Sequence, residues 1–258
     1  MFATAPEGTL SQTGALTHGL EILRLLAEAD GPLSSTEIAR RVDLHQSSAS
    51  RILKTLIAVG YVRKPDYRSF AVDLGVLTLG GSALRHFGLA TKPRAALAAL
   101  AERCDGLLVS LATLWRGQII YFLRYHKGHE PVLLSVGGYP LHLSSPALRL
   151  LLALPEEHAL QALEGSRQRY GWERPTRRVP ADPGAALKAA VSLLRHDALV
   201  LDGWQGEGRL SAAIPIEVPG EPPAALALAG PAGERSVEEI LLLLQEGRRA
   251  VETELHHS

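Results

Sequence analysis

The first part of the chain places apolar residues at helical spacing between polar ones. Leu20, Leu23 and Leu26 recur every three positions, which is typical of an amphipathic helix. The motif Ser34-x-x-Glu37 then has the form of a capping box, and a second apolar-periodic run follows it. The pattern therefore predicts two successive helices separated by a short turn.

The next segment, residues 44–56 (LHQSSASRILKTL), predicts a third helix with two contrasting faces. At about 100° per residue, the apolar residues between Ala49 and Ile57 share the side that such a helix buries. The opposite side carries short hydroxyls, an amide and two cations: Gln46, Ser47, Ser50, Arg51 and Lys54.

A hairpin is predicted after this helix. Two short β-prone runs, residues 61–62 and 70–72, flank a turn that contains Pro65 and Asp66. Three helices followed by a hairpin form the element order of a winged helix-turn-helix. The predicted turn is basic, because it includes Arg63, Lys64 and Arg68.

The pattern changes beyond residues 76–90, which predict a linker helix interrupted by glycines. Strands and helices then interleave without a regular βαβ order, which predicts an α+β domain with a mainly antiparallel sheet. We expect strands at 107–115, 118–126, 131–136, 198–202, 209–218 and 224–230, with Arg116-Gly117 as a turn, and helices at 91–106, 146–165, 185–196 and 236–255, with a loop at 166–184.

Length and composition favour two soluble domains. The chain has 258 residues and balances 27 basic against 27 acidic ones, so an anionic partner requires a local basic surface. Residues 34–68 provide one, with seven cations against three acids. The single cysteine, Cys104, excludes an intramolecular disulfide and fits a reducing cytoplasm. Because no apolar run approaches the roughly 20 residues of a membrane span, we expect no membrane association.

The polar face of the third helix has the chemistry of DNA recognition. Gln can hydrogen-bond adenine, Arg can hydrogen-bond guanine, and phosphate contacts fix the register. A single helix of this kind is more often an ordinary solvated face, but the capping box, turn, polar helix and basic hairpin occur here in order. The expected DNA-binding residues are Ser35, Thr36, Gln46, Ser47, Ser50, Arg51, Lys54, Arg63, Lys64 and Arg68.

Residues 16–80 resemble the N-terminal domain of the IclR family of bacterial transcriptional regulators, most clearly in SSTEIARRVDLHQSSASRILKTLIAVGYV. VGGYPLHLSSPALRLLLALP and DGWQGEGRLSAAIPIEVPGEPPAALALAGP resemble the second domain of that family. The resemblance implies a homodimer or dimer of dimers that binds a palindromic operator as a repressor or an activator. It also implies a GAF-like domain that binds a small organic effector. The predicted domains are a tail (1–15), the winged helix-turn-helix (16–75), the linker (76–90) and the effector domain (91–258).

The sequence departs from the family in the region that the resemblance assigns to the effector. Residues 144–149 (SSPALR) replace a glycine-lysine pattern, although Ser145 followed by Pro146 still predicts a helix cap with proline in the first helical position. A glutamate of the second motif is replaced by Gly203 and Trp204. The effector is therefore apolar or aromatic, or effector control has been lost. The expected effector-binding residues are Leu143, Ser144, Ser145, Ala147, Asp202, Trp204, Ser211, Ala227 and Ala229.

Other candidate chemistry is weaker. Cys104 reads more readily as a buried structural thiol than as a redox sensor, and His126, His129 and His142 have no carboxylate at ligand spacing. We therefore expect no metal site and no cofactor, although the resemblance leaves zinc open as an alternative, because some members of the family bind it. The competing functional class is a metabolite-binding module or an enzyme whose winged helix serves protein contacts. Residues 91–258 contain no catalytic motif that would favour an enzyme.

Overall fold

The computed structural model describes residues 14–172, 177–217, 219–233 and 235–256. The chain divides into two compact units between Leu84 and Arg85, and each unit has its own apolar core. The division falls within the segment that was expected to form the linker.

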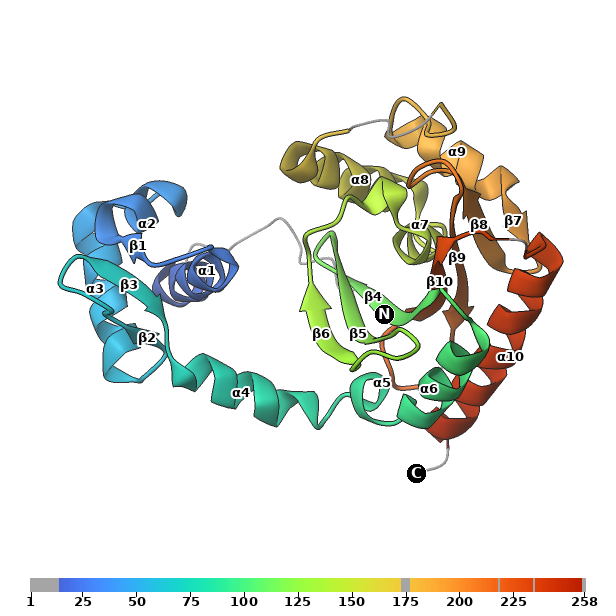
Figure 1. Cartoon of the computed structure of the whole chain (residues 1–258). Coiled ribbons are helices and arrows are strands. Elements are labelled where there is room, and N and C mark those ends of the chain that lie inside the picture. The colour runs from blue at the N-terminus through green and yellow to red at the C-terminus, as the bar shows by residue number, and fades with distance from the viewer. Residues whose placement is uncertain (1–13, 173–176, 218, 234, 257–258) are drawn as a thin grey trace. The chain divides into compact units, whose positions relative to one another are not determined.

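The N-terminal unit contains the predicted three helices and hairpin (Figure 1). A strand that the pattern did not predict joins the hairpin, giving a small antiparallel sheet in the order β1-β3-β2. This strand has only two residues, too few to show alternation. The elements are α1 (Gly14–Glu28), β1 (Leu33–Ser34), α2 (Ser35–Arg41), α3 (Gln46–Ala58), β2 (Val62–Arg63), β3 (Ser69–Val72) and α4 (Leu74–Leu84).

One apolar cluster holds these elements together. It takes residues from α1, α2, α3 and the hairpin, which fixes α3 against the sheet. Full burial of each aliphatic side chain contributes about 1.5–3 kcal/mol, so the apolar stripe of α3 is sufficient to anchor it. The buried members are Ile22, Leu26, Ile38, Leu53, Val62 and Phe70.

The linker prediction was partly wrong. Gly80 and Gly81 lie inside α4 without interrupting it, because glycine lowers helix stability by about 1 kcal/mol but is compatible with helical geometry. The break comes at residues 85–87, before the short helix α5 (Gly88–Thr91).

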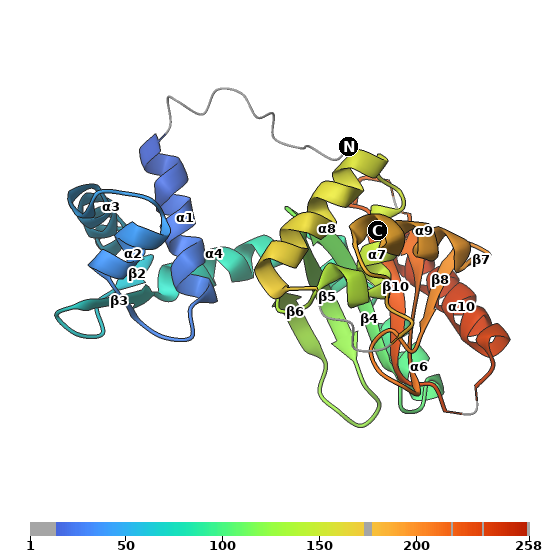
Figure 2. The same ribbon diagram turned by 90° about the horizontal axis from the view of Figure 1, so that it is seen from above.

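The C-terminal unit is built around a seven-stranded sheet in the order β6-β5-β4-β10-β9-β8-β7 (Figures 1 and 2). Every neighbouring pair is antiparallel, which confirms the predicted α+β class. Its elements after α5 are α6 (Arg94–Arg103), β4 (Leu108–Trp115), β5 (Gln118–Tyr125), β6 (Val132–Val136), η1 (Leu141–Leu143), α7 (Ser145–Leu151), α8 (Glu156–Tyr170), α9 (Pro183–Ser192), β7 (Leu194–Arg195), β8 (Ala198–Asp202), β9 (Arg209–Ile216), β10 (Ala224–Pro231) and α10 (Val237–His256).

Helices cover both faces of this sheet. On β10, Ala225 and Ala227 cluster with Leu150 of α7, whereas Leu226 lies next to Gly247 of α10. Because successive side chains of a strand point to opposite faces, α7 and α10 lie on opposite sides. Helix α6 contacts α10 and β4, and α8 and α9 pack beside α7.

Several boundaries differ from the prediction. The single helical stretch expected at 146–165 is two helices, α7 and α8, separated before Glu156 by Pro155. Helix α8 continues to Tyr170, into the predicted loop 166–184, of which residues 173–176 lie outside the described residues. The helix expected at 185–196 ends at Ser192, because the next residues form edge strand β7 and pair with β8. The strand expected at 209–218 ends at Ile216.

Candidate functional sites: nucleic-acid interface and effector region

Helix α3 separates its apolar and polar residues as the sequence predicted. Ala49 and Leu53 are fully buried, while Gln46, Ser47, Arg51 and Lys54 are exposed and Ser50 is half-buried. The buried side docks α3 on the core, so its first two turns present side chains that can reach the edges of bases.

A hydrogen bond between helices fixes the orientation of one of these side chains. Gln46 Nε2 donates to Thr36 Oγ1 at 3.3 Å, from the first turn of α3 to the start of α2. The second amide hydrogen and the amide oxygen of Gln46 are therefore held in a defined direction. An amide in this state can still donate and accept at an adenine edge.

The turn of the hairpin, residues 63–69, is organised by Asp66. Its Oδ1 accepts hydrogen bonds from the backbone N–H groups of Arg68 (2.7 Å) and Ser69 (2.9 Å). The Ser69 hydroxyl donates a further hydrogen bond to the Asp66 carboxylate. This bond has the largest effect on the pKa of Asp66, and together with the two backbone bonds it holds that pKa below its usual value. Tyr67 projects from the turn, and the Arg68 guanidinium lies 4.8 Å from the centroid of its ring.

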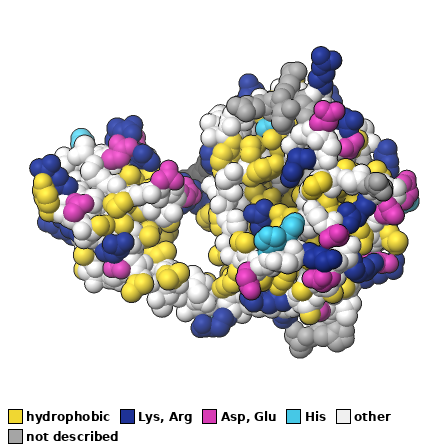
Figure 3. Space-filling model, in the orientation of Figure 1, with side chains coloured by type: hydrophobic (Ala, Val, Ile, Leu, Met, Phe, Trp, Pro, Cys, Tyr) yellow, Lys and Arg dark blue, Asp and Glu magenta, His cyan; other side chains and the backbone are white. Residues whose placement is uncertain are grey.

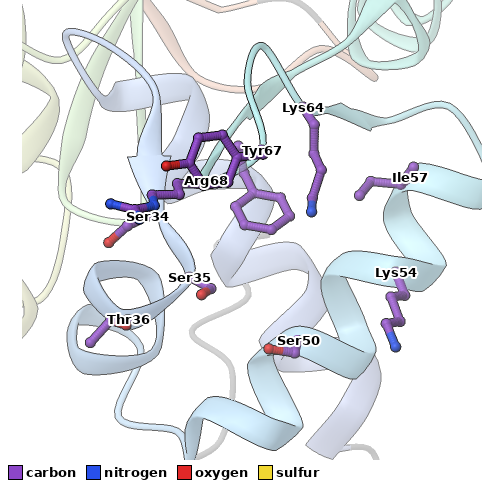
Figure 4. A pocket seen from close by; sticks show the side chains of 10 residues that line it. Ser34, Ser35, Thr36, Ser50, Lys54, Ile57, Lys64, Tyr67 and Arg68 are labelled. Atoms are coloured by element: carbon purple, nitrogen blue, oxygen red, sulfur yellow. The ribbon is translucent and has the colours of Figure 1, made fainter.

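Helix α3, the start of α2 and the hairpin enclose a hollow of about 380 Å³ (Figure 4). In Figure 4, Ser50 and Lys54 come from α3 and Lys64 from the hairpin, and all face the same opening. The structure thus brings together six of the ten expected DNA-binding residues: Ser35, Thr36, Ser50, Lys54, Lys64 and Arg68. Gln46, Ser47, Arg51 and Arg63 are exposed outside it. The lining also includes four residues that were not among the expected DNA-binding residues: Ser34, Ile57, Tyr67 and Phe70.

Two nearby cations are already paired. Ser34 is the N-cap of α2, as predicted, and accepts a hydrogen bond from the Glu37 N–H at 3.2 Å. The Glu37 carboxylate turns forward to Arg40 (2.9 Å) and Arg41 (2.6 Å), and these hydrogen bonds lower its pKa to about 2. Glu37 balances one of these two charges, whereas α3 and the hairpin carry five cations against one acid, Asp66.

In the C-terminal unit, five of the expected effector-binding residues meet where α7 begins. The hydroxyls of Ser145 and Ser211 are fully buried and lie 2.6 Å apart. The cap prediction was wrong by one residue: Ser144 is the N-cap and accepts from Ala147 N–H at 3.3 Å, so Ser145 occupies the first helical position and Pro146 the second. Ala147 and Ala227 are buried in the same layer.

Two further expected residues, Leu143 and Ala229, lie beside this cluster in sequence or strand pairing. Ala229 lies opposite Ser211 on the neighbouring strand, and the carbonyl of Leu143 accepts a hydrogen bond from Gln205 Nε2 at 2.9 Å. Tyr121 was not predicted, yet its hydroxyl lies 3.4 Å from Ser144 Oγ. Successive side chains of a strand point to opposite faces of the sheet, and this alternation along β5 is the signal that could have identified Tyr121.

Asp202 and Trp204 line a different groove, of about 620 Å³. Asp202 follows Leu201, the partner of Ser211 in the β8–β9 ladder, so its side chain leaves the opposite face of the sheet. It forms an ion pair with Arg178. Trp204 is buried and belongs to the core cluster. The structure therefore does not bring Asp202 to the serine cluster.

Two other residues considered from the sequence, Cys104 and His142, are buried in the C-terminal unit. Cys104 is fully buried, and this burial raises the pKa of its thiol to about 11, which makes it unreactive. His142 is buried and stacks on Trp172, with ring centroids 3.9 Å apart. Within the described residues, no helix is both long and apolar enough to span a membrane. In the same ranges, no three histidine, cysteine, aspartate or glutamate side chains are arranged to hold a metal ion.

Comparisons with known proteins agree with this geometry. The IclR helix-turn-helix domain matches residues 15–66. The Pca regulon regulatory protein of Pseudomonas putida is 28% identical over 205 residues, covering 78% of this chain and 68% of that protein. The curated relatives are aligned over 59–79% of their own lengths.

Solved structures extend the similarity to the whole chain. The IclR family transcriptional regulator from Brucella abortus is 23% identical, with a TM-score of 0.76 over 97% of this chain and 95% of that one, which shows a common fold. An IclR homolog from Microbacterium hydrocarbonoxydans, complexed with 4-hydroxybenzoate, is 23% identical, with a TM-score of 0.69 over 95% of this chain and 100% of that one.

The fold and the matched domain define a DNA-binding transcriptional regulator of the winged helix-turn-helix class. Its second unit has the α+β fold of the structures to which it is similar. Its N-terminal unit carries an IclR helix-turn-helix domain, and most of the chain is similar to transcriptional regulators of the IclR family.

Proposed function

We propose that this regulator binds a palindromic operator as a dimer, or as a dimer of dimers, in the cytoplasm. Helix α3 lies in the major groove, and the hairpin contacts the phosphate backbone beside it. The observation that carries the proposal is the hollow in which Lys54 and Lys64 face the same opening from α3 and from the hairpin. Two cations on separate elements can hold one DNA strand and so fix the register of α3.

The proposed contacts divide by chemistry. Gln46, Ser47, Ser50 and Arg51 lie on the exposed side of α3 and read bases, with Thr36 orienting Gln46. The Ser35 hydroxyl, at the start of α2, also contributes to the proposed contact with DNA. The backbone contacts come from Lys54, Arg63, Lys64 and Arg68.

Exposed leucines on α1 and α4 support the proposed dimer. Leu16 and Leu20 of α1 are 67% and 59% exposed, and Leu74 and Leu77 of α4 are each 72% exposed. None of the residues of α4 is buried, and yellow apolar side chains lie along its surface in Figure 3. A partner that covers these leucines removes them from water. Two-fold symmetry then places the half-sites about 10 bp apart, or a multiple of that spacing.

We further propose that the C-terminal unit binds an apolar or aromatic effector at the serine cluster where α7 begins. The polar side chains at this point are short hydroxyls, and Ser145 and Ser211 already pair with each other. Tyr121 adds a largely buried phenol, and burial raises its pKa, which keeps it neutral. The complex of the Microbacterium homolog with 4-hydroxybenzoate supports an aromatic ligand. In this proposal the protein has no catalytic role.

A binding experiment on the full chain tests the proposed operator contact. The upstream DNA of the gene and a scrambled duplex of equal length are titrated at physiological salt, with Arg51→Ala as the variant. The proposal expects a specific complex that requires both half-sites, and loss of about 1–3 kcal/mol of base discrimination in the variant. Equal binding to both duplexes would refute it. A variant that binds like the wild type would remove Arg51 from the base-reading set.

A further inference from the structure

The turn that joins β5 to β6 brings two histidines together. The backbone N–H of His129 donates to the carbonyl of His126 at 3.0 Å, which closes the turn. Gly128 supplies the left-handed conformation that this turn requires, with φ +75°. The side chains of His126 and His129 are therefore held on the same side of the hairpin by the backbone. Both belong to the C-terminal unit, and neither is a member of the serine cluster.

Three lone-pair donors converge inside this turn. The Nδ1 atoms of His126 and His129 lie 3.0 Å apart. The carbonyl oxygen of Lys127 lies 3.2 Å from the first and 3.1 Å from the second. The three atoms thus form a nearly equilateral triangle. The rings are nearly perpendicular, at 80°, so each presents its Nδ1 edge to the same point.

No arrangement of protons satisfies all three contacts. A carbonyl only accepts, and a neutral imidazole carries one N–H. If both Nδ1 atoms are protonated, both N–H groups can donate to the carbonyl oxygen, and the 3.0 Å contact between the two nitrogens is then not a hydrogen bond. If only one is protonated, the lone pair of the other Nδ1 faces the carbonyl oxygen at 3.1–3.2 Å. A cation at the centre interacts favourably with all three atoms at once.

The dimensions of the triangle fit a transition-metal ion. With bonds of about 2.1 Å, an ion above the centre of the triangle lies roughly 1.1 Å out of its plane, and the angles between ligands are about 95°. These angles lie between the octahedral and tetrahedral values. The exposed position of His129 leaves the other coordination positions open to water. The nearby cation, Lys127 Nζ, lies 3.6 Å from Asp105 Oδ1, and this carboxylate offsets its charge.

We propose that His126, His129 and the carbonyl of Lys127 form a binding site for a divalent transition-metal ion that prefers imidazole, such as Ni²⁺, Cu²⁺ or Zn²⁺. The third ligand is a backbone oxygen, that of Lys127. Hard ions such as Mg²⁺, which prefer oxygen ligands, do not compete for this site.

Isothermal titration of the full chain with NiCl₂ tests the site. The variants are His126→Gln and His129→Gln, in a background of His256→Gln and His257→Gln that removes the adjacent histidines near the C-terminus. The matched control is His196→Gln, which removes an exposed histidine from another turn. We expect one ion bound with micromolar affinity, weakened about tenfold or more by either test variant and unchanged by the control.

A spectroscopic readout separates ligation from an indirect effect. With Cu²⁺, the electron paramagnetic resonance spectrum should show nitrogen coupling from two imidazoles, and from only one in His129→Gln. Circular dichroism of each variant checks that the fold is intact. Nickel binding that is unchanged in both test variants overturns the proposal, and so does the absence of binding by the wild type. Equal competition by Mg²⁺ overturns the assigned class of metal.

Discussion

Replacing Lys64 by alanine tests whether the hairpin binds the phosphate backbone. The Nζ atom lies 5.0 Å from the centroid of the Phe70 ring, at the edge of the hollow, and the side chain is exposed. Phe70 itself is only 8% exposed and belongs to the core. The substitution therefore removes one cation from the interface and leaves the apolar cluster in place.

The expected magnitude follows from the number of cations. Each phosphate neutralised in double-stranded DNA contributes about −0.9 to the slope of log K against log[salt]. In the proposed complex, four cations of each chain contact phosphates, or eight in the dimer, and this number predicts a slope of about −7: Lys54, Arg63, Lys64 and Arg68. Lys64→Ala removes two contacts per dimer and should change the slope to about −5. Between 50 and 200 mM salt, the fold-decrease in the affinity of the wild type should thus be about ten times larger than that of the variant.

Fluorescence anisotropy with a labelled operator duplex, over a series of KCl concentrations, measures this slope. Lys188→Ala, which removes an exposed cation from α9 in the other unit, is the matched control and should retain the slope of the wild type. The ratio of operator to scrambled-duplex affinity should stay constant in Lys64→Ala. An unchanged slope would refute the backbone contact. A changed ratio with an unchanged slope would instead assign Lys64 to base reading.

Three other substitutions test separate features. Thr36→Val removes the acceptor of Gln46 and should reduce adenine discrimination by about 0.5–1.5 kcal/mol per half-site, measured by competition with altered operators. Gly247→Ala should destabilise the C-terminal unit by about 1 kcal/mol in urea unfolding followed by tryptophan fluorescence, because overpacking against Leu100, 2.6 Å from the added Cβ, outweighs the gain in helix propensity. Glu37→Gln should make the stability of the N-terminal unit less dependent on acid pH. The pKa of Glu37 is about 2 in the folded protein against the usual 4.5, so its contribution to stability is complete above about pH 4.5 and is lost toward pH 2. Circular dichroism over this pH range measures the loss.

Each of these predictions has a defined contrary outcome. Thr36→Ser keeps an acceptor and should behave like the wild type, so an equal loss in both variants would exclude the hydrogen bond as the cause. Gly165→Ala in α8 places its Cβ in open space and should stabilise by about 0.5–1 kcal/mol. If Gly247→Ala is equally stabilising, the packing of α10 is looser than described. Identical acid dependence in Glu37→Gln and the wild type would exclude Glu37 as the titrating group.

The predicted winged helix-turn-helix rested on local signals that residues carry by themselves. The apolar stripe from Ala49 to Ile57 and the cap at Ser34 specify helices without reference to distant partners. The short strand β1 could not be predicted, because its pairing with β3 is a tertiary interaction between residues that are far apart in sequence. The hollow likewise depends on that pairing, since it places the start of α2 beside the hairpin.

The effector region was less predictable for a related reason. The pairing of Ser145 with Ser211 joins residues 66 positions apart, and nothing local distinguishes Ser144 from Ser145 as the cap. The opposite orientation of Asp202 depends on strand register, which a one-residue shift reverses. The Lys127 carbonyl has no side-chain signature, so a sequence pattern cannot identify it as a ligand.

Helix α4 has a consequence for how the regulator assembles. It has eleven residues, none of them buried, and it contains two adjacent glycines. A helix of this length is marginal in water even with favourable residues, and each glycine costs about 1 kcal/mol more. In the proposed dimer, the surface that covers these leucines also supplies the free energy that keeps α4 helical. Folding of α4 is then coupled to the proposed association, and we expect dilution that separates the chains to unwind the segment that follows each DNA-binding unit.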